Sequence, residues 1–447
     1  MKKTRIPAVF VATATLFFTA CSHPQKDALL LKDVTLIDGT GASPVLHTDI
    51  LIKGDTVAAI GKNLDSSNAT VVMLQGKTVM PTLISAHSHI GVLKGTTSKP
   101  ENYTHENILS QLKKYQDYGV LHVMALGSDL PYLFESGIRD SSAAGLWPGA
   151  RLHTAGYGFS VPDGMPPMDH LFRPANVAQV SVEMDSLKQL HPDMVKMWVD
   201  DFGGKAPKMK PAIYKAIIDE AHKRQLRVAA HVYHLADLQQ LVADGIDVIA
   251  HSVRDAVIDD TTIAQMRAKH IIYIPTLSLD EFAYIYADKP EWINDAFFRK
   301  SLEPGVYEMI TSEKFQNDLK NDPALAKNTA AFQTALKNLK KVYAAGILVA
   351  LGTDSGATPL RAQGFSEHLE LELLVQAGLT PLQAITAATF SAARALKVAG
   401  KSGTVTPGKT ADLLIVDGDP LSNIKNTRNI VAVYKAGKEV SKGPLSK

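Results

Sequence analysis

The sequence predicts an α/β protein: a (β/α)₈ barrel, or TIM barrel, with a small β-sandwich domain built from both chain ends. Apolar strand segments alternate with amphipathic helical segments over roughly 320 residues, which indicates successive βα units. Short strand segments bounded by turn residues lie before and after this region, which is typical of an antiparallel sheet. In a barrel of this kind, the chemistry lies at the carboxyl ends of the strands.

The N-terminus has the pattern of an export signal. The basic residues Lys2, Lys3 and Arg5 precede an apolar run over residues 6–18, followed by the small-residue segment TACS. This run is too short to cross a membrane as a helix. We therefore expect residues 1–20 to be a signal peptide.

Cys21 is the only cysteine in the chain, and it follows the apolar run directly. The segment resembles the lipobox of bacterial lipoproteins, although Phe18 stands where leucine is usual. We expect residues 21–27 to be a lipidated tether, so that the protein contacts a membrane only through this anchor. The expected location is the Gram-negative cell envelope, in the periplasm or at the outer membrane. The alternative is an ordinary secretory signal and a secreted or periplasmic protein.

Composition excludes several classes of function. The formal net charge of the 447 residues is +2, and loss of the signal would leave about −1, so the chain lacks the basic surface of a nucleic-acid-binding protein. Without Cys21 the chain has no thiol, and it can form no internal disulfide and offer no thiolate ligand. Any bound metal must use nitrogen and oxygen ligands.

The β-sandwich is expected from residues 28–80 and 401–447. The first range contains alternating segments such as ALLLKDVTLIDGTG and DILIKGDTVAAIG, each closed by turn residues. The second contains ADLLIVDGDP and NIVAVYKAGKEV. We expect the two sets to assemble into one domain beside a barrel over residues 81–400.

Two βα units are clear within the barrel range. Ile213 and Ile217 follow helical spacing, and the strand after them ends at His231. A second helix is expected over Leu235–Asp244, with Gly245 ending it and a strand ending at His251. Both histidines therefore lie where a barrel places its active site.

Residues 279–341 form an insertion that is rich in aromatic residues. Two interpretations remain open: helical packing against the barrel, or a lid that shapes the substrate pocket.

Six potential metal ligands each lie at the end of an apolar strand segment. His87 and His89 are two residues apart, so on an extended strand both imidazoles project to the same side. A central lysine in an apolar strand, as in PDMVKMWVDD, is unusual because lysine is seldom fully buried. The candidate ligands are His87, His89, Lys196, His231, His251 and Asp354.

These residues, together with the C-terminal GTVTPGKTADLLIVDGDPL, resemble the amidohydrolase superfamily of metal-dependent hydrolases. The closest pattern is the binuclear branch with a carboxylated lysine, similar to Xaa-Pro dipeptidases and to imidazolonepropionase-like amidohydrolases. Imidazolonepropionase-like enzymes generally use one metal and lack the lysine, so Lys196 favours the dipeptidases. Thr82 and Ser85 depart from the usual P-G-L-I-D-x-H-x-H motif, but neither position supplies a ligand.

The resemblance implies two divalent metal ions. His87, His89 and Asp354 would hold the first, and His231 and His251 the second. Lys196 would bridge them as a carbamate, because a desolvated lysine has a lowered pKa and its neutral amine can add carbon dioxide. Zinc is the expected metal, with manganese, cobalt and iron as alternatives.

The implied activity is hydrolysis of a carbon–nitrogen amide bond in a small molecule. A bridging hydroxide would attack the carbonyl, with Asp354 as general base and then general acid. We expect a dipeptide or an N-acyl amino acid as substrate. Cyclic amides, carbamates, lactones and phosphotriesters are alternatives, and an inactive binding lipoprotein is a distant one. A homo-oligomer is left open.

Five further residues are candidates for substrate contact. Tyr233 resembles a tyrosine that hydrogen-bonds the substrate carbonyl in related dipeptidases, or it packs in the core. Arg254 would bind a substrate carboxylate or form an internal ion pair. The remaining candidates are His234, His122 and His153.

Overall fold

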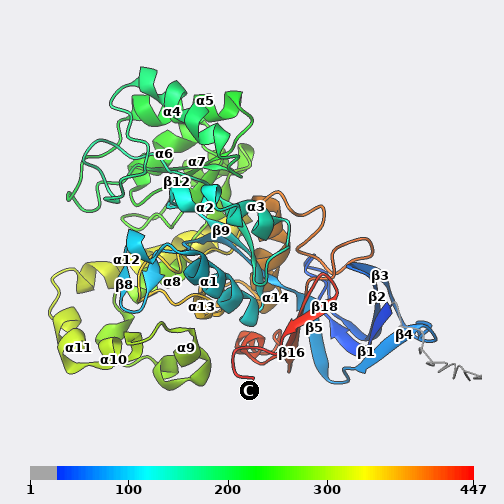
Figure 1. Ribbon diagram of the computed structural model, residues 1–447. Helices are drawn as coiled ribbons and strands as arrows, with labels where there is room; N and C mark the ends of the chain where they lie inside the picture. Colours follow the sequence, from blue (N-terminus) through cyan, green and yellow to red (C-terminus); the bar gives the residue numbers. More distant parts are fainter. Residues whose placement is uncertain (1–27, 447) are drawn as a thin grey trace, which may run out of the picture.

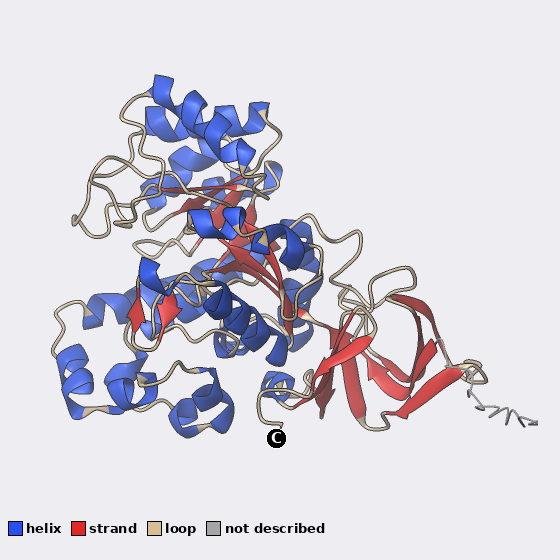
Figure 2. Ribbon diagram, viewed as in Figure 1, coloured by secondary structure: helices blue, strands red, loops and turns tan. Residues whose placement is uncertain are grey.

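The computed structural model describes residues 28–446. The predicted signal peptide and the predicted lipidated tether with Cys21 lie outside the described residues. The described chain forms a β-sheet unit at one side and a larger body of helices and strands (Figures 1 and 2).

Strands from both ends of the chain form one eight-stranded sheet. Its hydrogen-bonded order is β18-β17-β16-β5-β1-β2-β3, with β4 paired to β1. In Figure 1 the blue N-terminal strands lie beside the red C-terminal ones. The strands are β1 (Ala28–Leu36), β2 (Val45–Lys53), β3 (Thr56–Gly61), β4 (Ala69–Met73), β5 (Lys77–Pro81), β16 (Leu413–Asp417), β17 (Ile430–Lys435) and β18 (Lys438–Ser441).

The two ends share one apolar core. Leu31, Ile50 and Val79 from the N-terminal strands pack in the same cluster as Leu413 and Ile415 from β16. Strand β5 is the junction, because it pairs in parallel with β1 and antiparallel with β16. Burial of this common face makes the sheet depend on both ends of the chain.

The larger body contains parallel strands in two groups, a three-stranded sheet β10-β9-β6 and a five-stranded sheet β11-β12-β13-β14-β15. Main-chain hydrogen bonds join the groups on both sides, from Ala86 N to Leu351 O (2.8 Å) and from Asp193 N to Thr154 O (2.8 Å). The strands are β6 (Leu83–Ser88), β9 (Val120–Ala125), β10 (Arg151–Thr154), β11 (Val195–Trp198), β12 (Val228–His231), β13 (Val248–Ala250), β14 (Ile272–Ile274) and β15 (Leu348–Val349).

Helices connect these strands and cover them. The expected βα units are confirmed: α6 runs over the predicted residues, and Gly245 caps it with φ 91°. The connecting helices are α1 (His105–Asp117), α2 (Pro131–Glu135), α3 (Ile138–Ala143), α4 (Val177–Gln189), α5 (Pro211–Lys223), α6 (Leu235–Asp244), α7 (Asp260–Ala268), α13 (Phe365–Gln376), α14 (Pro381–Thr386) and α15 (Ala392–Ala395). Short helical turns are η1 (Pro100–Asn102), η4 (Ala387–Ser391) and η5 (Ile424–Arg428), and a small hairpin is formed by β7 (Leu93–Lys94) and β8 (Thr97–Ser98).

The aromatic-rich insertion is helical, and part of it lies at the edge of the molecule around α9, α10 and α11 (Figure 1). Its aromatic side chains pack on one another: Phe282 stacks on Tyr286, and Trp292 contacts Phe298 edge-on. Its elements are α8 (Leu277–Phe282), η2 (Ile285–Ala287), η3 (Glu291–Asn294), α9 (Ala296–Ser301), α10 (Val306–Thr311), α11 (Glu313–Lys320) and α12 (Leu325–Ala344). Among the described residues, no helix combines the length and apolar character needed to cross a membrane.

Candidate metal centre

The six predicted ligands lie in or after five strands, and five of the six lie at a carboxyl end or beyond it. His87 lies in β6 and His89 follows it directly, while Lys196 lies in β11. His231 ends β12, and His251 comes directly after β13. The sixth, Asp354, follows β15. Because the strands are parallel, these ends lie at the same side of the sheet.

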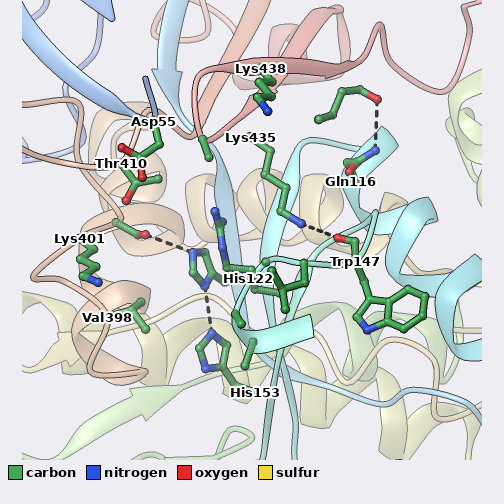
Figure 3. Close-up of a pocket in the computed structure, with 18 of the residues that line it drawn as sticks. Asp55, Gln116, His122, Trp147, His153, Val398, Lys401, Thr410, Lys435 and Lys438 are labelled. Atoms are coloured by element: carbon green, nitrogen blue, oxygen red, sulfur yellow. Dashed lines mark hydrogen bonds between the residues drawn. The ribbon is translucent and has the colours of Figure 1, made fainter. Parts of the chain in front are cut away.

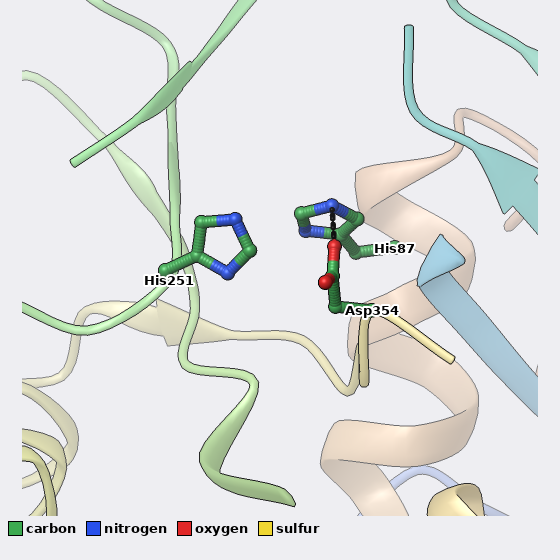
Figure 4. A group of neighbouring side chains, drawn as sticks. All are labelled: His87, His251 and Asp354. Atoms are coloured by element: carbon green, nitrogen blue, oxygen red, sulfur yellow. Dashed lines mark ion pairs between the residues drawn. The ribbon is translucent and has the colours of Figure 1, made fainter. Parts of the chain in front are cut away.

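His87, His89 and Asp354 converge on one point. The Oδ1 atom of Asp354 lies 3.0 Å from His87 Nε2 and 2.9 Å from His89 Nε2. His251 closes the group, and its ring centroid lies 4.6 Å from that of His87. Ligand atoms of His87, His251 and Asp354 lie within 4.8 Å of one another. Figure 4 shows the three side chains gathered from separate segments. The spacing suits donors that share a divalent ion.

Lys196 is fully buried, and its Nζ atom has no hydrogen-bond partner among the described residues. Burial lowers its pKa to about 7. The stem packs closely against Gly127, where a Cβ atom would lie 2.6 Å from Lys196 Cβ. The amine also lies close enough to His87 and His231 to lower the pKa of both.

Each histidine of the second pair has one ring nitrogen held by the protein. His231 Nε2 lies 3.3 Å from Asp200 Oδ2, and His251 Nδ1 lies 2.7 Å from Thr276 Oγ1. The remaining nitrogens, Nδ1 of His231 and Nε2 of His251, are the ones available to a metal. Their rings lie 4.4 Å apart between centroids.

Burial keeps these imidazoles neutral. It lowers the pKa of His87 to about 3 and that of His231 to about 4, and it holds the pKa of His251 well below its usual value. Neutral imidazole is the form that binds a metal.

Two of the ligands have left-handed backbone conformations. The φ angle is 73° at His251 and 59° at Asp354, and Thr276, the partner of His251, has φ 50°. Such angles are uncommon for residues other than glycine and are retained where the surroundings impose them. At Asp354, a 2.9 Å main-chain hydrogen bond from its N atom to His87 O fixes the carboxylate beside its histidine.

Arg361 contacts the second oxygen of Asp354. Burial alone would raise the pKa of Asp354, but Arg361 and the adjacent histidines outweigh this effect and hold the pKa well below its usual range. The carboxylate is therefore ionised at neutral pH, as a metal ligand must be.

A buried hydroxyl and carboxylate network supports the site from behind. Glu367 is fully buried and accepts hydrogen bonds from Thr353 (2.6 Å), Ser355 (2.9 Å) and Ser85 (3.1 Å). Ser85 stands where the usual motif has aspartate, so this departure gives the strand a polar partner for Glu367. Ser128, in turn, contacts Nδ1 of His89.

A cavity of about 700 Å³ opens in front of the cluster, and its size suits a small molecule. Tyr233, Arg254 and His234 line it, as expected of substrate contacts. Arg254, however, forms an ion pair with buried Asp280, and its guanidinium lies 4.8 Å from the ring centroid of Tyr233. The structure therefore supports the second interpretation of Arg254, which is an internal ion pair.

His122 and His153 are not brought to this cluster. They lie within β9 and β10 and line a different cavity, between the barrel strands and the C-terminal segment (Figure 3). His122 Nδ1 lies 3.0 Å from His153 Nε2, and His122 Nε2 lies 3.2 Å from Ser402 Oγ. Their predicted contact with substrate has no support in this position, because they line this other cavity and not the one in front of the ligand cluster.

Four residues of the site were not predicted: Asp200, Ser128, Thr276 and Arg361. Three of them contact a ligand histidine, and Arg361 contacts Asp354. The only sequence signal was for Asp200, an acidic residue directly after an apolar strand.

The donor set fits divalent metal binding. It offers neutral imidazoles, one ionised carboxylate and one buried amine without a hydrogen-bond partner, which is a costly arrangement unless a ligand completes it. Nitrogen and oxygen donors of this kind suit zinc, manganese, cobalt or iron.

The fold and the site together define a β/α hydrolase with its ligand residues at the strand ends. The chain belongs to the amidohydrolase family, whose model matches residues 78–440. This membership makes it an enzyme that acts on carbon–nitrogen bonds.

The chain is also similar to individual proteins. An uncharacterised protein of Mycobacterium tuberculosis is 26% identical over 371 residues, covering 78% of this chain and 81% of that protein. Ochratoxinase of Aspergillus niger is 28% identical over 239 residues, covering 52% of this chain and 42% of that enzyme. The crystal structure of a Xaa-Pro dipeptidase with bound methionine has a TM-score of 0.74 at 22% identity, covering 92% of this chain and 99% of that one, which shows a shared fold.

Proposed function

We propose that the protein is a binuclear metal-dependent hydrolase that cleaves the amide bond of a dipeptide or an N-acyl amino acid. Its site would lie at the carboxyl end of a closed (β/α)₈ barrel. The observation that carries the proposal is the buried Lys196 amine, which has no hydrogen-bond partner and lies among neutral histidines and the ionised Asp354.

The proposed ligands form two groups, one for each ion. His87, His89 and Asp354 would hold one ion, and His231 and His251 the other. Lys196 would bridge them as a carbamate, because a pKa of about 7 leaves much of the amine neutral and able to add carbon dioxide. We propose zinc as the metal, and manganese, cobalt or iron would fit the same donors.

When bound, two divalent cations supply Lewis-acid polarisation and lower the pKa of water. The protein contributes the proton transfers. Asp354 would accept a proton from the attacking water and return it to the leaving amine. Tyr233 lines the cavity beside His231 and would donate a hydrogen bond to the substrate carbonyl oxygen.

Basic side chains on the wall of the cavity favour a substrate with a free carboxylate. Lys205 and Lys327 line it, and neither forms an ion pair in the described part of the chain. Lys327 comes from α12 of the insertion, and its Nζ atom lies 5.5 Å from the ring centroid of Tyr233. A substrate carboxylate near these cations would place the adjacent amide bond near Tyr233. The fold shared with a Xaa-Pro dipeptidase supports the same substrate class.

The test is hydrolysis of matched substrate pairs by the zinc-loaded protein. The panel should hold dipeptides and N-acyl amino acids, each with a free carboxylate and as its carboxamide. We expect kcat/KM to be at least about tenfold higher for the free carboxylates, since a charge-assisted contact of this kind contributes about 1.4 kcal/mol or more. Absence of metal-dependent turnover with every amide in the panel would contradict the proposal.

A further inference from the structure

A second group of potential ligands lies beside the predicted binuclear site, on the wall of the same cavity. Asp200 and Asp201 follow β11, and His234 follows β12 directly before α6. Their ligand atoms lie within 4.8 Å of one another. The proposed binuclear site uses none of the three residues as a ligand.

The distances in this group are too long for hydrogen bonds and short enough for a shared ion. His234 Nε2 lies 3.8 Å from Asp200 Oδ1 and 3.8 Å from Asp201 Oδ1. Ligand atoms that each bind one zinc ion at about 2.1 Å lie about 3.4 Å apart in a tetrahedral site. The two distances to His234 exceed this value by about 0.4 Å, and all three ligand atoms lie within 4.8 Å of one another, so a modest movement of the side chains would bring them into coordination.

A fourth residue orients the ring of His234. Asp255 Oδ2 lies 3.0 Å from His234 Nδ1, and Asp255 Oδ1 accepts a 2.9 Å hydrogen bond from Leu235 N. A carboxylate on Nδ1 favours the tautomer with its proton there, which leaves a lone pair on Nε2. Three atoms with lone pairs then face the same small space.

Asp200 gives a second and independent indication of a ligand. Its side chain is only 5% exposed, and its Oδ1 atom has no hydrogen-bond partner in the described chain. The other oxygen lies against His231, so the free oxygen is the one directed to His234. Leaving a buried carboxylate oxygen without a partner is costly, and a cation would remove that cost.

We propose that Asp200, Asp201 and His234 bind a third divalent cation at the wall of the cavity. Asp255 orients the histidine, as carboxylates commonly do behind metal-bound imidazoles. Gly203 N donates a 3.0 Å hydrogen bond to Asp201 Oδ1 and so holds that loop in place. Three protein ligands leave a coordination position open toward the cavity, where an anionic group of a substrate could bind.

The alternative for the same geometry is an imidazolium ion held by three carboxylates. Metal stoichiometry separates the two, because only the cation site adds an ion to each chain. The purified protein should be equilibrated with Zn²⁺ and bicarbonate, freed of excess metal, and analysed for zinc per chain. We expect three ions in the wild type and two in His234→Gln and in Asp201→Asn.

His222→Gln is the matched control. His222 Nε2 lies 2.8 Å from Asp247 Oδ2, so this variant also removes a histidine–carboxylate pair, but one outside the cavity. It should retain three ions, and thermal melts should show that all variants are folded. Asp201→Asn keeps the test decisive if His234→Gln fails to fold.

Equal zinc content in the wild type, His234→Gln and Asp201→Asn would overturn the third site and leave the imidazolium. Lys196→Ala separates this result from failure of the binuclear centre, because Lys196 belongs only to that centre. If the wild type binds a single ion that is lost in His234→Gln and kept in Lys196→Ala, the third site stands and the binuclear proposal fails. Two ions in the wild type that are both kept in His234→Gln, with fewer in Lys196→Ala, would overturn the third site alone.

Discussion

His251 and Thr276 are joined by a 2.7 Å hydrogen bond between Nδ1 and Oγ1, and both residues have left-handed backbone conformations. The pairing assigns the ring nitrogens of His251, since Nδ1 is occupied and Nε2 is directed to the cluster. It also explains why two non-glycine residues retain uncommon φ angles, because each fixes the other at the edge of the site.

Replacing Thr276 with valine should weaken metal binding without removing a ligand. The variant keeps the side-chain shape and loses the hydrogen bond, so we expect metal affinity to fall by about 10-fold to 100-fold. Competition with a chelator measures the change. Thr276→Ser retains the hydroxyl and should bind metal like the wild type, and a loss of affinity in that variant too would contradict the role given to Oγ1.

Lys196→Ala should lower the metal content from two ions at the proposed centre to one or none. The variant removes the group that, in the proposed site, would bridge the two sets of histidines. Lys435→Ala is a matched control, since Lys435 is also buried but donates to Trp147 O (2.8 Å) and Gly149 O (2.9 Å), far from the ligands. Metal analysis of both variants after purification with bicarbonate decides the matter. Unchanged metal content in Lys196→Ala would show that Lys196 is not a bridge.

Asp354→Asn should reduce kcat far more than it reduces metal content. Loss of a general base costs about 10²-fold to 10⁴-fold, whereas several other ligands remain to hold the ions. Steady-state kinetics and metal analysis on the same preparation test this expectation. Asp412→Asn offers a comparison, because Asp412 is also buried and ionised but pairs with Arg151 outside the cavity. Near-normal turnover of Asp354→Asn would exclude it as the base.

Tyr233→Phe should lower kcat by about 10²-fold to 10³-fold with little effect on metal binding. The variant loses the hydroxyl but keeps the ring, so the contacts of Arg254 and Lys327 with the ring face are retained. Tyr273→Phe removes a buried hydroxyl that does not line the cavity and should leave kcat unchanged. Equal activity of the two variants would assign Tyr233 to packing.

Glu281→Gln should reduce the fall in the free energy of unfolding that occurs as pH rises from 4.5 to 7. Burial and the neighbouring Glu372 raise the pKa of Glu281 to about 7, above the 4.5 of an unfolded chain. Between these values the unfolded state loses the proton first, so the free energy of unfolding falls as pH rises from 4.5 to 7, by up to about 3 kcal/mol. Urea unfolding across this range should show a smaller decline for Glu281→Gln. Glu313→Gln, at an exposed residue of α11, should keep the wild-type slope.

The ligand set could be predicted because each of its members lies in an apolar strand or after one. The ends of parallel strands meet at one side of a barrel, so a residue such as Asp354 lies beside His87 although the two are far apart in the chain. The βα unit over α6 was equally predictable, since its helical spacing ends at Gly245 and a strand follows.

The partners of the ligands could not be predicted. Thr276 and Ser128 are ordinary hydroxyl residues in sequence, and only the fold shows that they hold a histidine ring. Arg361 lies in a loop whose path the strand pattern does not define. His122 and His153 were predicted to contact substrate, but both line another cavity, which their positions along the sequence do not reveal.

The sheet at the chain ends has a consequence for biosynthesis. Strand β5 lies between β1 and β16, so the second edge of β5 remains without a hydrogen-bonded neighbour until residues 413–417 have been synthesised. Contacts of such long sequence separation form slowly, because a large loop must close before they contribute. Nearly the whole polypeptide must therefore leave the ribosome before this unit can fold, and a prematurely terminated chain would expose the open edge of β5 to aggregation.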